Sequence, residues 1–118
     1  MWWIVGIFIV IIILKQLLTH NISVANATEK LNHGAILIDV RTPGEFAGEH
    51  HQGAINVPLD NLNQITTVVK DKNSSVLLYC HSGARAATAC SQLRRMGYSD
   101  IRNIGSYSRT RKVLNKIA

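Results

Sequence analysis

Cys80 lies where the pattern of its neighbours would place a reactive group. It directly follows the apolar run 76–79, which is typical of a buried strand, and a strongly helical segment starts four residues later. Ligands of open α/β sheets bind at the carboxyl ends of the strands. The type and position of this residue therefore predict a nucleophile at the edge of a sheet.

The short loop from Cys80 to Arg85 strengthens this prediction. Gly83 allows the backbone to curl, so that successive N–H groups can turn inward and form an anion-binding nest. A helix N-terminus and a guanidinium beside the nest favour the thiolate, which is the nucleophilic form of cysteine. Position and loop composition alone leave a second interpretation open, in which Cys80 is a buried and inert cysteine.

Three segments resemble, in the same order, the signatures of rhodanese domains. The segment 37–46 resembles the first signature, His50 with 53–58 resembles the second, and 80–86 resembles the active-site loop. The resemblance extends over about 24–104. It implies a sulfurtransferase without a cofactor, which moves sulfur from a small anionic donor such as thiosulfate to a thiol or cyanide acceptor through a cysteine persulfide.

The resemblance also assigns roles to individual residues. It makes Cys80 the catalytic nucleophile, and it makes the residues that follow the substrate-binding cradle around its sulfur: His81, Ser82, Gly83, Ala84 and Arg85. We expect Asp39 and Arg41 to give structural support by ion pairing, and His50 to be a hydrogen-bonding residue at a turn. The five histidines show no metal-ligand spacing with a cysteine, so no metal site is expected.

Two other functions are possible on the same fold. The first is a non-catalytic rhodanese-like binding module, although such a module needs neither Cys80 nor Arg85. The second is a phosphatase or arsenate reductase, whose loops resemble one another in having five residues between cysteine and arginine. Here four residues separate the two, and a tighter loop suits a sulfur atom better than a tetrahedral phosphate.

The sequence departs from the family pattern outside the cysteine loop. Glu49 stands where the family has glycine before its histidine, and His51 stands where an apolar residue follows it. The closing stretch Gly105-Ser106-Tyr107 lacks the usual pair of glycines and the tryptophan after them. These departures concern acceptor recognition more than persulfide chemistry.

The chain around these motifs alternates between strands and helices. Apolar runs predict strands at 35–40, 54–57, 76–79 and 101–104, and amphipathic spacing predicts helices at 24–32, 59–70, 84–96 and 107–117. Between them, 41–53 is predicted as a loop with one helical turn. Strands that alternate with helices give an α/β fold with a mostly parallel sheet covered on both faces, as the rhodanese resemblance also implies.

The length of 118 residues allows one domain, which needs no disulfide to be stable. Two cysteines do not make a disulfide framework, so both are expected to be thiols. Cys90 shares an apolar helix face with Ala86 and Leu93. We expect it to be a packing residue, too far along the helix to form a disulfide with Cys80.

The N-terminal residues 1–18 are almost wholly apolar and are predicted to be an uncleaved, single-pass transmembrane anchor. A tether at 19–23 and the rhodanese domain at 24–118 would follow. Lys15 follows the apolar run and no basic residue precedes it, which favours a cytoplasmic domain. A periplasmic or extracytoplasmic domain is the alternative, and Ala25-Asn26-Ala27 offers the pattern of a signal-peptide cleavage site.

The formal net charge of +6 is concentrated in the C-terminal third. From Ala84 to the end, eight Lys and Arg stand against one acidic residue, whereas the preceding part is nearly balanced. This asymmetry indicates solvated helix faces, or else an anionic partner such as a lipid surface or a small anion. A nucleic-acid partner is not expected, because aromatic residues are few and are not interleaved with the basic ones.

Overall fold

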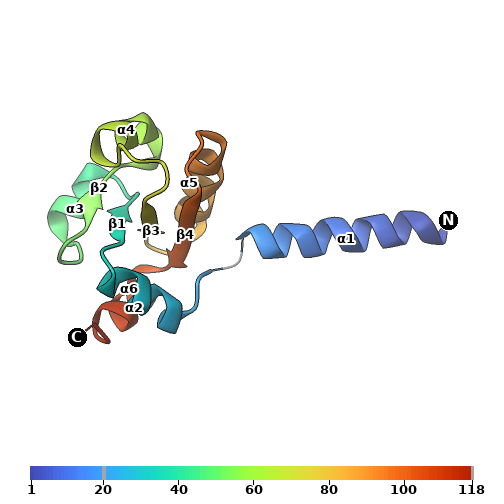
Figure 1. Cartoon of the computed structure of the whole chain (residues 1–118), viewed down its shortest axis with the longest axis horizontal. Helices are drawn as coiled ribbons and strands as arrows, with labels where there is room; N and C mark the ends of the chain where they lie inside the picture. Colours follow the sequence, from blue (N-terminus) through green and yellow to red (C-terminus); the bar gives the residue numbers. More distant parts are fainter. Residues whose placement is uncertain (20, 118) are drawn as a thin grey trace.

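The computed structural model describes residues 1–19 and 21–117, with side chains described except at 15–19. A four-stranded sheet with the strand order β2-β1-β3-β4 forms its centre (Figure 1). All three strand pairs are parallel, which confirms the predicted sheet. The strands are the following: β1 (Ile36–Asp39), β2 (Ile55–Asn56), β3 (Ser75–Tyr79) and β4 (Asp100–Gly105).

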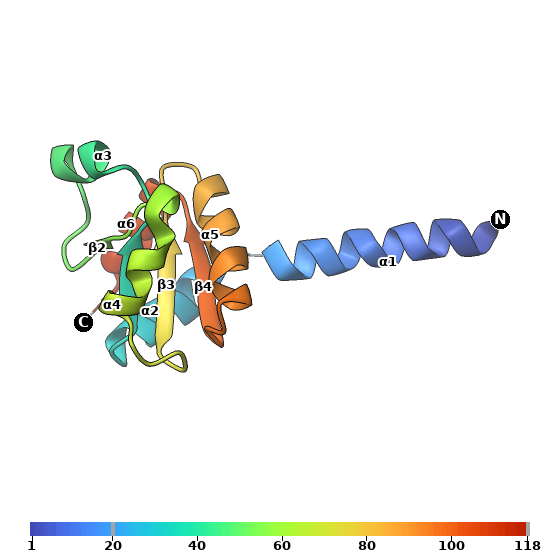
Figure 2. The same cartoon turned by 90° about the horizontal axis from the view of Figure 1, so that it is seen from above.

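Helices cover the sheet on both faces (Figures 1 and 2). One face packs against α5 (Ala84–Arg95) and α4 (Ile65–Val68), and the other against α2 (Val24–Asn32) and α6 (Tyr107–Leu114). Each face has its own cluster of buried apolar side chains. The central strand β3 contributes to both clusters, which explains why its sequence is apolar without alternation.

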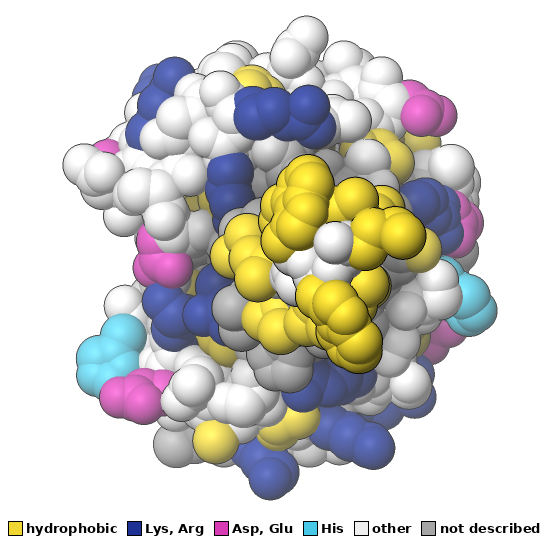
Figure 3. Space-filling model, turned by 90° about the vertical axis from the view of Figure 1, so that its right-hand side faces the viewer, with side chains coloured by type: hydrophobic (Ala, Val, Ile, Leu, Met, Phe, Trp, Pro, Cys, Tyr) yellow, Lys and Arg dark blue, Asp and Glu magenta, His cyan; other side chains and the backbone are white. Residues whose placement is uncertain are grey.

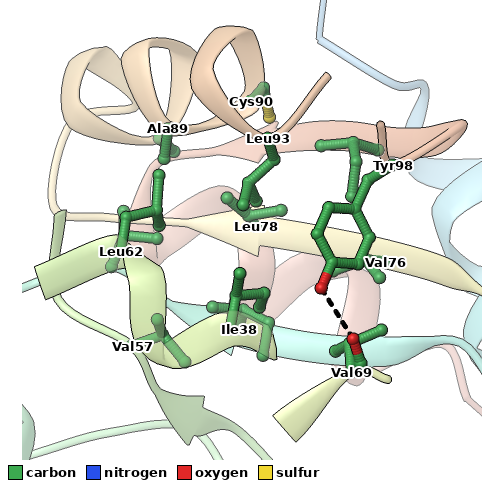
Figure 4. Close-up of a cluster of buried hydrophobic side chains, with 14 of the residues drawn as sticks. Ile38, Val57, Leu62, Val69, Val76, Leu78, Ala89, Cys90, Leu93 and Tyr98 are labelled. Atoms are coloured by element: carbon green, nitrogen blue, oxygen red, sulfur yellow. Dashed lines mark hydrogen bonds between the residues drawn. The ribbon is translucent and has the colours of Figure 1, made fainter. Parts of the chain in front are cut away.

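The larger cluster lies under α5 and fixes that helix against the sheet. Figure 4 shows Leu78 of β3 and Leu93 of α5 among its members, with Cys90 beside them. The Tyr98 hydroxyl donates a hydrogen bond of 2.7 Å to the carbonyl of Val69, so its one polar atom is satisfied inside the cluster. This packing determines where the N-terminus of α5 lies relative to the end of β3.

The predicted helix at 59–70 is wrong as a single element. The chain forms a 3₁₀ segment, η1 (Leu59–Gln64), followed by the single turn of α4. Asn61 interrupts the segment with φ −136° and ψ 46°, which is not helical. Thr66 and Thr67 donate their hydroxyls to carbonyls three residues earlier, at 3.0 and 2.8 Å, and such bonds compete with regular helix.

The N-terminal segment forms the helix α1 (Trp2–Thr19), which projects away from the sheet domain. The prediction that it is a single-pass transmembrane anchor is wrong. Among the described residues, no helix has both the length and the apolar character needed to cross a bilayer. The apolar run 2–14 spans about 20 Å at 1.5 Å per residue, less than a hydrocarbon core of ~30 Å.

The surroundings of α1 are visible from its free end. Figure 3 shows apolar side chains of the helix projecting from the domain, with Lys and Arg side chains on the surface around them. The predicted orientation depended on Lys15, whose side chain lies outside the described residues, as does the tether residue His20.

The anionic partner inferred from the C-terminal charge stays a prediction.

Candidate active site

Cys80 lies at the carboxyl end of β3, as expected, and is completely enclosed at 0% exposure. Its backbone N–H donates a 3.2 Å hydrogen bond to the Gly105 carbonyl of the neighbouring strand β4. Its Sγ accepts a 3.0 Å hydrogen bond from the N–H of Gly83. This N–H places a hydrogen-bond donor directly against the sulfur atom.

Gly83 gives the loop its shape. With φ 99° it occupies the left-handed region as the N-cap of α5, a conformation that favours glycine. A Cβ at this position would lie 3.1 Å from Cα of Gly105, so the loop is packed directly against β4. The curled loop that the sequence predicted is therefore present, and its backbone N–H of Gly83 faces the sulfur.

The other predicted cradle residues fall into two groups. The side chains of His81, Ser82 and Ala84 are exposed, so only their main chain can contribute to the enclosure of the sulfur. The His81 carbonyl accepts a 3.1 Å hydrogen bond from the N–H of Tyr107, which ties the loop to the start of α6.

Arg85 brings the charge that the sequence predicted, but it does not act alone. Its Nη1 and Nη2 donate to the two carboxylate oxygens of Glu45 at 2.7 and 3.1 Å. The hydrogen bond with Glu45, and more weakly the interaction with Cys80, raise the pKa of Arg85. Arg85 is therefore bonded directly to the Glu45 carboxylate and adds positive charge near the thiol.

Glu45 is a site residue that the sequence analysis missed. It belongs to α3 (Pro43–Gly48), where it forms a capping box with Thr42: Oε1 accepts from the Thr42 N–H, and the Thr42 hydroxyl accepts from the Glu45 N–H. Hydrogen bonds from Arg85 and Thr42 lower the pKa of Glu45 to about 2. The capping pattern Thr-x-x-Glu was visible in the sequence, whereas the contact with Arg85 was not.

Asp39 and Arg41 form a buried ion pair beside the site. The Nη2 of Arg41 donates to Oδ2 of Asp39 at 2.8 Å, and also to the Glu49 carbonyl at 2.6 Å. The hydrogen bond with Asp39 raises the pKa of Arg41. The Arg41 guanidinium lies 4.8 Å from the ring centre of Tyr107.

Two of the departures from the family pattern meet in space. The rings of His51 and Tyr107 are stacked with their centres 3.9 Å apart, and Nε2 of His51 lies 2.8 Å from the Tyr107 carbonyl. Burial lowers the pKa of His51, and the nearby Arg111 and Arg41 lower it further. His51 and Tyr107, which both depart from the family pattern, therefore pack against each other at the start of α6.

His50 lies at a turn, and its Nδ1 is 2.8 Å from the Phe46 carbonyl. Its ring is stacked on that of Phe46, with 3.8 Å between centres. It is exposed, and these contacts are local to α3.

Cys90 lies in the apolar cluster under α5 at 2% exposure (Figure 4), which confirms the predicted packing role. Burial raises the pKa of its thiol to about 12. Both cysteines are free thiols. Cys90 is therefore a poor nucleophile, whereas the Sγ of Cys80 accepts the Gly83 N–H.

The space beside the site is small. A hollow of about 40 Å³ is lined by Arg85 together with residues of the β1 and β2 ends, among them Val40, Thr42 and Pro58. Two larger hollows, of about 370 and 350 Å³, are lined by residues outside the Cys80 loop. The Cys80 loop therefore lines neither of these two larger hollows.

Comparisons with known proteins agree on one family. The family model described as a rhodanese-like domain matches residues 23–110. The chain is 45% identical to thiosulfate sulfurtransferase PspE of Escherichia coli over 69 residues, which span 58% of this chain and 66% of that protein. It is 33% identical to thiosulfate sulfurtransferase 16 of Arabidopsis thaliana over 101 residues, covering 75% of this chain and 83% of the relative.

A solved structure supports the same assignment. The chain resembles a rhodanese with anions from E. coli, with a TM-score of 0.62 and 40% sequence identity. The alignment covers 64% of this chain and 91% of that structure.

Proposed function

This chain belongs to the rhodanese-like domain family, and from that premise we propose that it is a sulfurtransferase that carries sulfane sulfur as a persulfide on Cys80. The observation that carries the proposal is the 3.0 Å hydrogen bond from the Gly83 N–H to Sγ at the end of β3. The names of the relatives support thiosulfate as a donor.

The proposed reaction has two displacements at sulfur. In the first, the Cys80 thiolate attacks the outer sulfur of thiosulfate, and the sulfur–sulfur bond of the donor breaks. Its electron pair leaves with sulfite, and the enzyme becomes a persulfide anion. In the second, an acceptor thiolate or cyanide attacks the terminal sulfur, and the Cys80 thiolate is regenerated. No cofactor takes part in either displacement.

The charges around the loop suit this chemistry. The Gly83 N–H donates to Sγ, and Gly83 is also the N-cap of α5, so a helix N-terminus that favours negative charge lies next to the sulfur. Arg85 adds a positive charge for the anionic donor, and Glu45 holds the guanidinium by two hydrogen bonds. Asp39 holds the Arg41 guanidinium, which donates to the Glu49 carbonyl and so fixes the chain that follows α3.

The enclosure of Cys80 limits what can react. Because the residue is 0% exposed, the donor sulfur reaches it only when part of the structure that encloses it moves. The small hollow beside Arg85 and the four-residue loop favour a sulfur atom over a phosphate or arsenate group. A purely binding role would need neither the bonded thiol nor the paired guanidinium.

A transfer assay tests the proposal. The full chain, given thiosulfate and cyanide, should form thiocyanate, and Cys80→Ser should form none. Cys90→Ala is the matched control, because it removes the buried thiol and leaves the loop untouched. Equal rates for the wild type and Cys80→Ser would overturn the proposal, and absence of transfer with thiosulfate, other sulfane donors and several acceptors would favour a binding module.

A further inference from the structure

Asn103 is a buried polar residue among apolar neighbours. It lies on β4 at 5% exposure, in register with Leu78, on the face that Ile101 and Cys80 fill with apolar side chains. Its Oδ1 is buried and has no hydrogen-bond partner among the described residues. A buried amide with an unpaired oxygen costs stability, and an apolar residue of the same shape would avoid that cost.

The other half of the amide has a specific partner. Nδ2 of Asn103 donates a 3.1 Å hydrogen bond to the carbonyl of Gly83. This carbonyl also accepts the N–H of Ala87 at 3.0 Å, so it would keep a partner without Asn103. Asn103 is therefore not needed to satisfy the carbonyl, and its contribution is to fix the direction in which the carbonyl points.

Gly83 connects Asn103 to the sulfur of Cys80, because it is hydrogen-bonded to both residues. Its carbonyl is held by Asn103, while its N–H donates to Sγ of Cys80 at 3.0 Å. Gly83 has φ 99°, and a glycine has more backbone conformations available than any other residue. The two hydrogen bonds therefore restrict a residue that has no side chain to limit its conformation. Holding one side of Gly83 therefore helps to keep its N–H on the sulfur.

An irregularity in β4 brings Asn103 to this place. The pairing runs from Leu78 with Asn103 directly to Tyr79 with Gly105, so Ile104 is an extra residue in the strand. Bulges of this kind redirect side chains near functional sites. Ile104 packs in the cluster on the opposite face, and Asn103 stays on the face of the cysteine loop.

We propose that Asn103 is a positioning residue for Cys80: it holds the carbonyl of Gly83 and so limits rotation of this residue, which keeps the N–H of Gly83 directed at the negative sulfur. The inference rests on the proposed role of Cys80 as the reacting thiol. It adds a residue of β4 to a site that the sequence placed wholly in the cysteine loop and the β1 end.

The test measures thiol reactivity rather than turnover. The full-length wild type and Asn103→Leu are treated with iodoacetamide across a range of pH, and peptide mapping follows alkylation of Cys80. The leucine side chain has nearly the same shape but no donor. We expect alkylation at neutral pH to be about three- to tenfold slower in the variant, with the midpoint of the pH profile moved upward by up to about one unit.

The stability of the same variant separates positioning from a structural role. Because the unpaired Oδ1 disappears and Gly83 keeps its bond from Ala87, Asn103→Leu should unfold at the same denaturant concentration as the wild type or a higher one. A purely structural asparagine would give the reverse result: lower stability and an unchanged midpoint. That result would overturn the proposal.

Two further variants complete the experiment. If Asn103→Leu does not fold, Asn103→Ala, which is smaller, should show the same upward midpoint, and an unchanged midpoint there overturns the proposal. Asn56→Ala is the matched control, since Asn56 also donates to main-chain carbonyls, those of Asp39 and Arg41, but not to the cysteine loop. Its midpoint should stay that of the wild type. If the wild type accepts no sulfur and the midpoint still moves, only the proposed function fails.

Discussion

Replacing Glu45 with glutamine removes one charge from the site and leaves its geometry in place. The amide oxygen of glutamine can still accept the Thr42 N–H in the capping box, so Glu45→Gln isolates the ion pair with Arg85. We expect the variant to be less stable at neutral pH and to hold Arg85 less firmly beside Cys80.

The size of the effect follows from the pKa and the exposure of the pair. The pKa of Glu45 is lowered from 4.5 to about 2, chiefly by the hydrogen bond from Arg85. Unscreened, this change corresponds to ~3 kcal/mol. The two side chains are 37% and 36% exposed, however, and exposed pairs contribute about 0.2–1 kcal/mol. For this bidentate pair we expect a loss of about 1 kcal/mol in the free energy of unfolding.

The pH dependence gives the prediction its sign. Because the pKa of Glu45 is lower in the folded state than in the unfolded state, its stabilisation is complete above about pH 4.5 and is lost as the pH falls towards 2. The gap between wild type and Glu45→Gln should therefore shrink over this range. Urea unfolding at several pH values measures this difference in the free energy of unfolding. Glu29→Gln, on the exposed face of α2, is the control. A gap that stays constant down to pH 3 would refute the reasoning.

The other predictions concern two residues outside the loop. His51→Phe should become more stable relative to the wild type as the pH falls from 7.5 to 5. The pKa of His51 is lowered in the folded state, so the unfolded wild type binds a proton in this range more readily than the folded wild type does. Thermal unfolding at both pH values measures the difference, and an equal loss of stability in the two proteins would contradict the prediction. Cys90→Ala should cost about 1 kcal/mol in the free energy of unfolding and keep most of the transfer rate, since it removes a small side chain from the cluster under α5. Denaturant unfolding and the thiocyanate assay check the two parts, and a lost transfer rate in a folded variant would assign Cys90 a role in the chemistry.

The fold was largely predictable because its signals are local. Continuous apolar runs identified the strands, and the amphipathic stretch after Cys80 identified α5 to within one residue of its end. The errors have physical causes as well. Threonine hydroxyls compete for the carbonyls at 63 and 64, which the apolar spacing of 59–70 did not reveal. The apolar run of α1 has the composition of a bilayer span but is shorter than one, and composition alone predicts the span wrongly.

The site was predictable only where it is contiguous in sequence. Cys80, Gly83 and Arg85 lie within six residues, so loop composition was enough to propose a nest for the sulfur. Glu45 meets Arg85 across forty positions, and Asn103 meets Gly83 across twenty. No local pattern encodes such pairs, because they depend on how β1, β3 and β4 are ordered in the sheet.

The central claim is that sulfur is carried on Cys80, and the intact mass of the full chain after incubation with thiosulfate tests it most directly. The wild type and Cys90→Ala should each gain the mass of one sulfur atom, which a reducing thiol removes again, and peptide mapping should place it on Cys80. Cys80→Ser should gain nothing. A Cys80→Ser variant that still gains the mass of one sulfur atom would contradict the account. So would a wild type whose mass stays unchanged with several sulfane donors.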